Sequence, residues 1–264
     1  MMNNALAVLH IPHASSIIPP EERNNIVLSD EALQQELLQI TDWFTDDLFT
    51  SGRDDCVALR FPVSRLVLDP ERFEDDEKEE MAKKGMGVIY TRSSSGAVLR
   101  HNSVADTERE RLLDCYYRPH HRCLNQLVAD ILETHHKALV IDCHSFPKAP
   151  LLYENDQRPE RADICIGTDN LHTPDWLCDL LLAAFQQRKY TVAVNRPFAG
   201  AMIPSNYYTK NVAVSGVMIE LRRDLYMDEK TGRRHAGYAA LKQALDGVIN
   251  DLLQSFRVRE VADA

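Results

Sequence analysis

Short apolar segments alternate with longer amphipathic segments along this chain, and this alternation is the feature that most constrains its fold. Segments of strand length lie at residues 5–12, 56–62, 64–69, 136–145, 163–169, 190–195 and 212–221. Segments with apolar residues at helical spacing lie at residues 30–50, 106–136, 173–189 and 235–256. The pattern predicts an α/β fold with a mixed, mostly parallel sheet flanked by helices. Ligands of such folds gather beyond the carboxyl ends of the strands.

Composition and charge narrow the class of protein. The 264 residues, 44% of them hydrophobic, are expected to form a single domain over residues 1–264. The net charge of −10 argues against non-specific nucleic-acid binding, which needs an excess of Lys and Arg. The chain has neither a basic, apolar leader nor a run of 18 apolar residues, so we expect a cytoplasmic protein with no membrane partner. Six scattered cysteines with no C-x-x-C pair indicate buried free thiols.

Residues able to bind a metal or accept a proton follow three of the apolar segments. His13 follows the first, His144 ends the fourth and Glu220 ends the last, and Asp42 is added by the first helical segment. The carboxyl ends of parallel strands meet at one edge of a sheet, so these groups are expected to converge there. A catalytic zinc takes three His, Asp or Glu ligands and leaves a position open for water. The pattern indicates His13, Asp42 and His144 as ligands of zinc or another divalent metal. Glu220 would then be the general base for the attacking water.

Other interpretations of these residues remain. A single His or Glu after a strand is often a loop residue or a hydrogen-bonded buried group, and no spacing matches a self-sufficient zinc motif such as H-E-x-x-H. A serine nucleophile is disfavoured because the chain has no G-x-S-x-G motif. A Cys143 nucleophile paired with His144 is disfavoured because adjacent residues of a strand point to opposite faces.

Short motifs spread along the chain carry a family resemblance. They are IPHASSIIPP (11–20), TDWFTDDLF (41–49), SRLVLDPERF (64–73), YYRPHHRCL (116–124), IDCHS (141–145) and IELRRDLYMDE (219–229). Together, and in this order, they resemble the N-formylglutamate amidohydrolase (deformylase) family. The resemblance implies a zinc-carboxypeptidase-like α/β fold and metal-dependent hydrolysis of an N-acyl amino acid. The implied reaction releases formate and glutamate from N-formylglutamate, a late step of histidine breakdown.

The resemblance carries over to individual residues. The resemblance implies the metal ligands and the general base named above. Asp42 is preferred to Asp46 as the carboxylate ligand only because Asp42 lies in the T-D-W segment. Arg65 and Arg72 match the S-R-x-x-x-D-x-x-R element, and His121 matches the histidine of the Y-x-x-x-H segment. A substrate with two carboxylates needs guanidinium donors, because Arg binds a carboxylate through two parallel hydrogen bonds. The substrate-binding candidates are Arg65, Arg72, His121, Arg196, Arg222 and Arg223.

Three departures from the family pattern bear on the substrate. Ser15 stands where the family carries glycine, Glu71 stands where it carries asparagine, and an acidic run follows at residues 74–80. Negative charge near the substrate opposes the binding of a dianion. Two alternatives to N-formylglutamate hydrolysis are therefore hydrolysis of a different N-acyl amino acid or small amide, and a catalytically silent relative that only binds its ligand.

Overall fold

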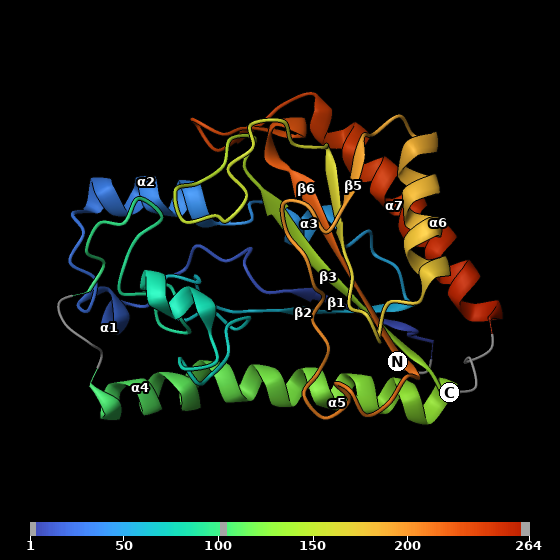
Figure 1. Ribbon diagram of the computed structural model, residues 1–264, viewed down its shortest axis with the longest axis horizontal. Helices are drawn as coiled ribbons and strands as arrows, with labels where there is room; N and C mark the ends of the chain where they lie inside the picture. Colours follow the sequence, from blue (N-terminus) through green and yellow to red (C-terminus); the bar gives the residue numbers. More distant parts are fainter. Residues whose placement is uncertain (1–3, 101–104, 260–264) are drawn as a thin grey trace.

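A six-stranded sheet crosses the middle of the molecule (Figure 1). The structure is a computed structural model that describes residues 4–100 and 105–259. Its strand order is β2-β1-β3-β6-β4-β5. The strands are β1 (Ala7–Ile11), β2 (Cys56–Arg60), β3 (Ala138–Phe146), β4 (Ile164–Gly167), β5 (Val192–Val194) and β6 (Val214–Arg222). Strands β2, β1, β3 and β6 are mutually parallel, whereas β4 pairs antiparallel with β6 and parallel with β5. The predicted mixed, mostly parallel sheet is confirmed.

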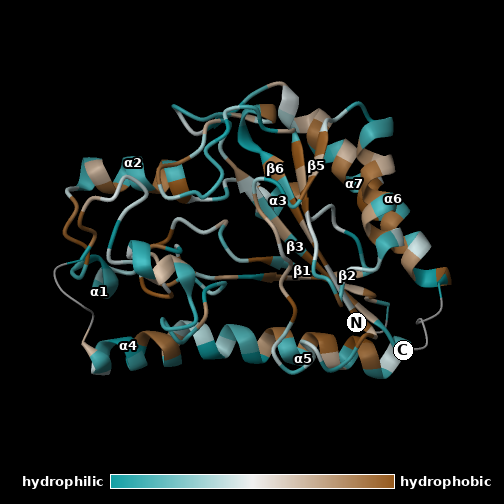
Figure 2. Ribbon diagram, viewed as in Figure 1, coloured by the Kyte–Doolittle hydropathy of each residue, from teal (hydrophilic) through white to brown (hydrophobic). Residues whose placement is uncertain are grey.

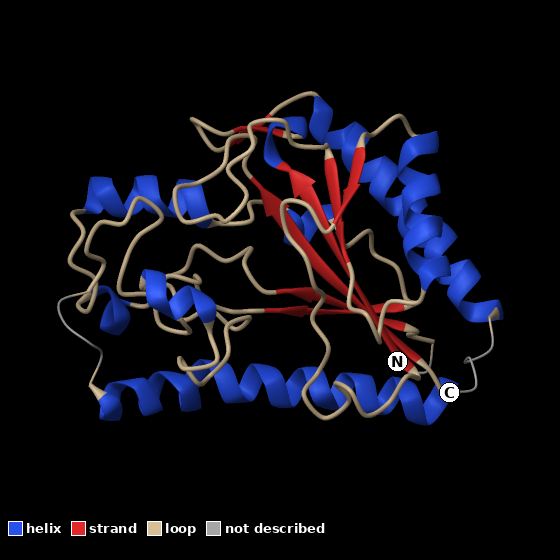
Figure 3. Ribbon diagram, in the orientation of Figure 1, coloured by secondary structure: helices blue, strands red, loops and turns tan. Residues whose placement is uncertain are grey.

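Helices cover the sheet on both faces (Figure 3), with α6 and α7 on one side and α5 on the other. The main helices are α2 (Asp30–Ile40), α4 (Asp106–Leu112), α5 (Arg118–His135), α6 (Asp175–Gln187) and α7 (Gly237–Val258). Shorter helical turns are α1 (Pro20–Arg23), α3 (Thr45–Leu48), η1 (Glu80–Lys84), the π-helical η2 (Leu113–Tyr117) and η3 (Arg223–Leu225). A small hairpin is formed by β7 (Met227–Asp228) and β8 (Arg233–Arg234). None of the helices in the described ranges has the length and apolarity that a bilayer-spanning segment needs.

Side chains of the central strands alternate between the two helical layers, and the strands are hydrophobic over most of their length (Figure 2). On β1 and β3, Leu9 and Ile141 pack in the core under α6 and α7, whereas Val8 and Val140 pack against α5. Because strand side chains repeat every two residues, the next positions along the α5-facing rows share that face. On β3 the next positions are Asp142 and His144, so the apolar row ends in polar groups near the carboxyl end of the strand.

Two expectations about local structure differ from the fold. The helix expected at residues 30–50 begins at the Ser29 cap but ends at Ile40, because Thr41 is extended and Phe44 has a positive φ of 66°. Asp42 therefore lies in a loop between α2 and α3 rather than on a helix. The segment 64–69, expected to be a strand, is irregular and turns back on itself. Its apolar residues pack into local clusters instead of joining the sheet.

The cysteines that the sequence places in the described part of the chain are all free. Cys143 and Cys165 are buried as expected, but Cys115 and Cys123 are exposed on the long helical segment that includes α5. Free thiols are thus confirmed, whereas burial holds for only part of the set.

Candidate active site

The imidazole of His13, which follows β1, is held by carboxylate and imidazole partners. Its Nε2 atom donates to Asp69 Oδ1 at 2.8 Å, and its Nδ1 atom lies 3.3 Å from His144 Nδ1. A carboxylate on one nitrogen fixes the tautomer, so the lone pair of His13 is on Nδ1 and points into the site. Asp69 is itself anchored by Arg65 at 2.7 Å and by the Tyr90 hydroxyl. Burial opposes ionisation of Asp69, but Arg65 and His13 hold its pKa well below the usual range.

His144 and Asp42 meet His13 from two other segments. The Nδ1 atom of His144, on β3, lies 3.0 Å from Asp42 Oδ2. The second oxygen of Asp42 accepts a hydrogen bond from Arg223 at 2.9 Å, which holds the carboxylate in one orientation. Burial opposes ionisation of Asp42, but the adjacent imidazoles of His13 and His144 and the charge of Arg223 keep its pKa far below the usual range. Asp42 is therefore an ionised carboxylate with one oxygen turned toward the two histidines.

These three donor atoms fit the size of a zinc ion. The distances between His13 Nδ1, His144 Nδ1 and Asp42 Oδ2 are 3.3, 3.0 and 3.7 Å. Atoms bound about 2.0–2.1 Å from a tetrahedral zinc are themselves about 3.3–3.4 Å apart. The donor set of two imidazoles and one carboxylate is also the chemistry that a catalytic zinc uses.

Glu220 lies directly beside this triangle, because it and His144 are register partners on β6 and β3. Its side chain is buried, and among the described residues its Oε2 atom has no hydrogen-bond partner. Burial raises the pKa of Glu220 to about 8, despite the opposing charge of His144. A buried carboxylate with an unused oxygen and a pKa near neutrality can accept and release a proton.

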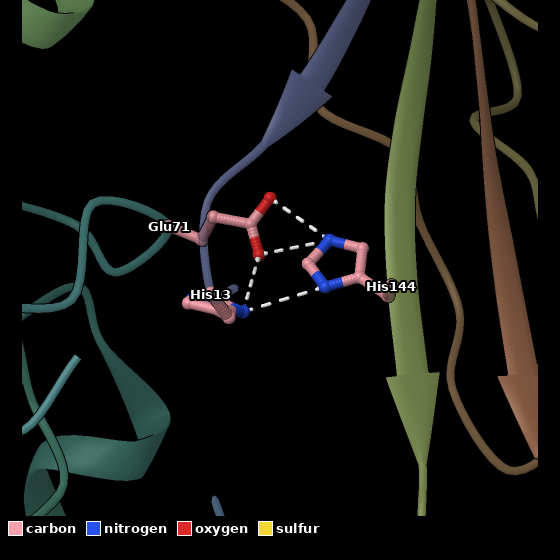
Figure 4. Close-up of side chains that lie close together, drawn as sticks. All are labelled: His13, Glu71 and His144. Atoms are coloured by element: carbon pink, nitrogen blue, oxygen red, sulfur yellow. Dashed lines mark hydrogen bonds and ion pairs between the residues drawn. The ribbon is translucent and has the colours of Figure 1, made fainter. Parts of the chain in front are cut away.

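Glu71 reaches the same point from the irregular segment that follows β2. Figure 4 shows its carboxylate directed at the imidazoles of His13 and His144. Its Oε2 atom lies 3.1 Å from His144 Nε2 and 3.6 Å from His13 Nδ1. Burial opposes ionisation of Glu71, but His144 and His10 hold its pKa well below the usual range. His13, Glu71 and His144 are therefore also spaced closely enough to hold a metal ion.

The second such group lies beneath the first and contains His10, Glu71 and Asp142. His10 Nδ1 lies 2.8 Å from Asp142 Oδ1 and 3.5 Å from Glu71 Oε1, and His10 Nε2 lies 2.9 Å from His120 Nε2. Burial would lower the pKa of His10, but its hydrogen bonds to Asp142 and Glu71 raise it to about 9. Burial lowers the pKa of His120 to about 2, and the charge of His10 adds to this effect. His10 thus supplies a positive charge beneath the two carboxylates.

The site opens into a cavity of about 480 Å³, a size suited to a small-molecule substrate. Its walls include Arg65, Arg72, Arg223 and the loop 198–203. A neighbouring cavity of about 770 Å³ shares the segment 71–73 with it. The larger cavity includes Glu71 but not His13, Asp42, His144 or Glu220, all of which line the smaller one.

The predicted substrate-binding residues are only partly brought together. Arg65, Arg72 and Arg223 line the smaller cavity, although Arg65 pairs with Asp69 and Arg223 pairs with Asp42. Three predicted residues lie elsewhere, namely His121, Arg196 and Arg222. His121 lines the larger cavity, where it hydrogen-bonds the Pro70 carbonyl at 2.8 Å. Arg196 lines a surface hollow near Asp156. Arg222 forms ion pairs with Asp163 and Asp224. Of the two candidate carboxylates, Asp42 lines the smaller cavity and Asp46 does not.

Sequence reasoning did not predict Asp69 as a site residue, and it named Glu71 only as a departure bearing on the substrate and not as a group near a metal. Asp69 and Glu71 lie in an irregular segment that was expected to begin as a strand, so no strand-end pattern pointed to them. The only available signal was the SRLVLDPERF motif itself, in which both carboxylates are spaced close to Arg65 and Arg72.

Comparison with known proteins assigns the family. The family model for N-formylglutamate amidohydrolase matches residues 6–227, a range that runs from before His13 to beyond Glu220. The chain belongs to this family. The family resemblance carried by the sequence motifs is thus confirmed.

Individual proteins match this chain over nearly its whole length. N-formylglutamate deformylase from Pseudomonas aeruginosa is 27% identical over 258 residues, covering 94% of this chain and 91% of that protein. The crystal structure of N-formylglutamate amidohydrolase from Ralstonia eutropha JMP134 has a TM-score of 0.83 at 24% identity, and covers 97% and 94% of the two chains. A gene product of Agrobacterium tumefaciens has a TM-score of 0.71 at 21% identity, with the same coverage. These two structures share the fold described above.

Proposed function

We propose that this protein is a metal-dependent amidohydrolase that cleaves the amide bond of an N-acyl amino acid, with N-formylglutamate as the leading candidate substrate. The observation that carries the proposal is the triangle of donor atoms from His13, His144 and Asp42 beside the unpartnered, buried carboxylate oxygen of Glu220. The family membership and the Pseudomonas aeruginosa deformylase support the choice of substrate. The products would be formate and glutamate, as a late step of histidine breakdown requires.

The proposed mechanism divides the work among the site residues. His13, Asp42 and His144 would hold the ion, with zinc as the first choice. When bound, zinc lowers the pKa of a nearby water and polarises the scissile carbonyl. Glu220 would take the proton of the attacking water on its free oxygen and pass it to the nitrogen of the leaving amine. Burial raises the pKa of Glu220, which favours the release of the proton to the leaving amine only after Glu220 has accepted it as the ionised carboxylate.

Of the three arginines that line the smaller cavity, Arg72 is the one that the protein's own carboxylates engage least. Its Nε atom is buried without a hydrogen-bond partner in the described ranges and lies 3.7 Å from Asp69. Arg65 and Arg223 also line the cavity, but carboxylates of the protein already engage them. We infer that Arg72 binds the α-carboxylate of the substrate through its guanidinium group.

The same distribution of charge favours a second candidate substrate. N-formylglutamate carries two carboxylates, whereas Glu71 adds a negative charge to the wall of the cavity. A neutral N-acyl amino acid has one carboxylate and would need only Arg72. We therefore keep the hydrolysis of a neutral N-acyl amino acid as the alternative activity of the same site.

The proposal is tested by measuring metal content and turnover together. Protein stripped with a chelator and reloaded with Zn²⁺ is expected to bind about one ion per chain. Amine release is then measured from N-formylglutamate, N-formylaspartate and N-formylleucine, before and after reloading. Release that depends on the ion supports the amidohydrolase, and the preferred substrate chooses between the two candidates. Ligand binding without any release would instead identify a catalytically silent relative.

A further inference from the structure

Glu71 lies at the site with an arrangement that the proposed mechanism does not use. Its Oε2 atom is 3.6 Å from His13 Nδ1, the nitrogen whose lone pair faces the site. The same oxygen is 3.1 Å from His144 Nε2. Only 15% of the side chain is exposed, so the carboxylate has little access to solvent. We propose that Glu71 is a further protein ligand of the metal, an inference that rests on the proposed function.

Glu71 differs from the other carboxylates of the site in the residues with which it forms ion pairs. Those found in the described residues all involve histidines, namely His10, His13 and His144. By contrast, the carboxylates of Asp42 and Asp69 each pair with an arginine, whose charge is permanent.

Metal binding changes the balance of charge around Glu71. A histidine that binds a metal does so as a neutral imidazole, so His13 and His144 cannot also supply positive charge to a carboxylate. A buried carboxylate without a compensating charge is costly. His10 pairs with both Glu71 and Asp142 and so offsets only one of their two negative charges. The divalent ion bound by these histidines is the further charge that can compensate Glu71, and direct ligation brings the two closest.

Glu71 can reach the ion through the oxygen that lies beside His13 Nδ1, whereas its contact with His144 is at Nε2 and not at the proposed donor Nδ1. Asp42 approaches His144 at Nδ1, whereas Glu71 approaches the same ring at Nε2. The two carboxylates therefore come from different sides, and both lie within 3.7 Å of His13 Nδ1. His13, His144, Asp42 and Glu71 offer two nitrogen and two oxygen donors, all of types that zinc accepts, and a zinc that expands to five-coordinate would keep a position for water.

The test compares the zinc affinity of the wild-type protein with that of Glu71→Gln, measured in the absence of substrate by competition with a chromophoric chelator. The glutamine keeps the size of the side chain but removes its charge. Loss of an outer partner of a metal ligand costs about 10–100-fold in affinity, so loss of a ligand is expected to cost at least about 100-fold. The visible spectrum of the Co²⁺-loaded protein is expected to change as well, because it reports the coordination number.

Glu74→Gln is the matched control, because Glu74 is three residues away and pairs with Arg118 outside the metal site. It is expected to bind zinc like the wild-type protein. If Glu71→Gln does not fold, Glu71→Asp retains the charge but shortens the reach by one methylene, and the same loss of affinity and spectral change are expected.

The outcomes separate this inference from the proposed function. Wild-type protein that binds no metal refutes both. Wild-type protein that binds zinc, together with a Glu71→Gln variant of equal affinity and unchanged Co²⁺ spectrum, overturns the role of Glu71 alone. In that case, a changed substrate preference in the variant would assign Glu71 to substrate recognition instead.

Discussion

The close contact between β4 and the loop 198–203 makes a substitution at Gly167 informative. A Cβ atom added to Gly167 would lie 2.2 Å from the carbonyl oxygen of Gly200 and 2.4 Å from Met218 Cε. The methionine end can rotate away, but the backbone carbonyl can move only with its loop. An ordinary carbon–oxygen contact is about 3.3 Å, so Gly167→Ala should push the loop away from the strand by about 1 Å.

The expected effect follows from what the loop does. Because the loop 198–203 lines the substrate cavity, its displacement should lower kcat/KM by about 10–100-fold, the scale associated with a 1 Å misplacement. Overpacking should also lower the free energy of unfolding by about 1–3 kcal/mol. The proposed metal ligands lie on other segments, so zinc content should not change. Turnover of the candidate substrates, thermal unfolding and elemental analysis measure the three effects.

Gly247→Ala on α7 provides the matched control. The added Cβ atom would lie 2.7 Å from Arg188 Nη2, but this contact is with the flexible end of a side chain. Alanine in a helix interior is favoured over glycine by about 0.5–1 kcal/mol, so stability should change little and kcat/KM should not change. If folded Gly167→Ala protein retains wild-type kcat/KM, the loop does not shape the substrate pocket and the reasoning is wrong.

Three further substitutions test separate parts of the site. Glu220→Gln keeps the shape of the side chain but cannot accept a proton, so kcat should fall by about 100-fold or more with zinc retained; loss of the zinc would make Glu220 a ligand instead. Asp69→Asn should weaken zinc binding by about 10–100-fold, because the His13 tautomer is no longer fixed, and unchanged affinity in a chelator competition would contradict this role. Arg72→Met should raise KM for N-acyl amino acids while leaving zinc affinity close to wild type, and an unchanged KM would exclude Arg72 as the carboxylate partner.

The parts of the site that the sequence could predict are those attached to regular strands. His144 and Glu220 end apolar segments, and parallel pairing brings them side by side in register. A strand fixes side-chain direction with a period of two, so a residue's place in the sequence determines the face on which it lies. His13 follows the same logic, because it comes directly after the strand that pairs with β3.

The remaining site residues depend on backbone turns and on partners distant in the sequence. Arg222 and Arg223 are adjacent in the sequence, but β6 ends between them, so only Arg223 turns back to Asp42. The role of Arg65 depends on Asp69. The Asp69 carboxylate accepts a hydrogen bond from the Arg65 guanidinium, so this guanidinium is less free to bind a substrate. Glu71 comes from a segment without periodicity, and no pattern fixes where such a segment directs its side chains. Tertiary contacts, rather than local propensity, decide these positions.

The separation of the ligands along the chain bears on how metal loss affects this protein. His13 and His144 are 131 residues apart, yet their Nδ1 atoms lie 3.3 Å from each other, because the strands β1 and β3 pair side by side. In small zinc modules the ion itself gathers the ligands, and its removal unfolds the chain. Here hydrophobic strands and helices bring the ligands together. The loss of chain entropy that this requires therefore occurs when the protein folds and not when it binds the metal. The apoprotein should therefore remain folded and able to reload, which makes metal supply a reversible control on the fraction of active molecules.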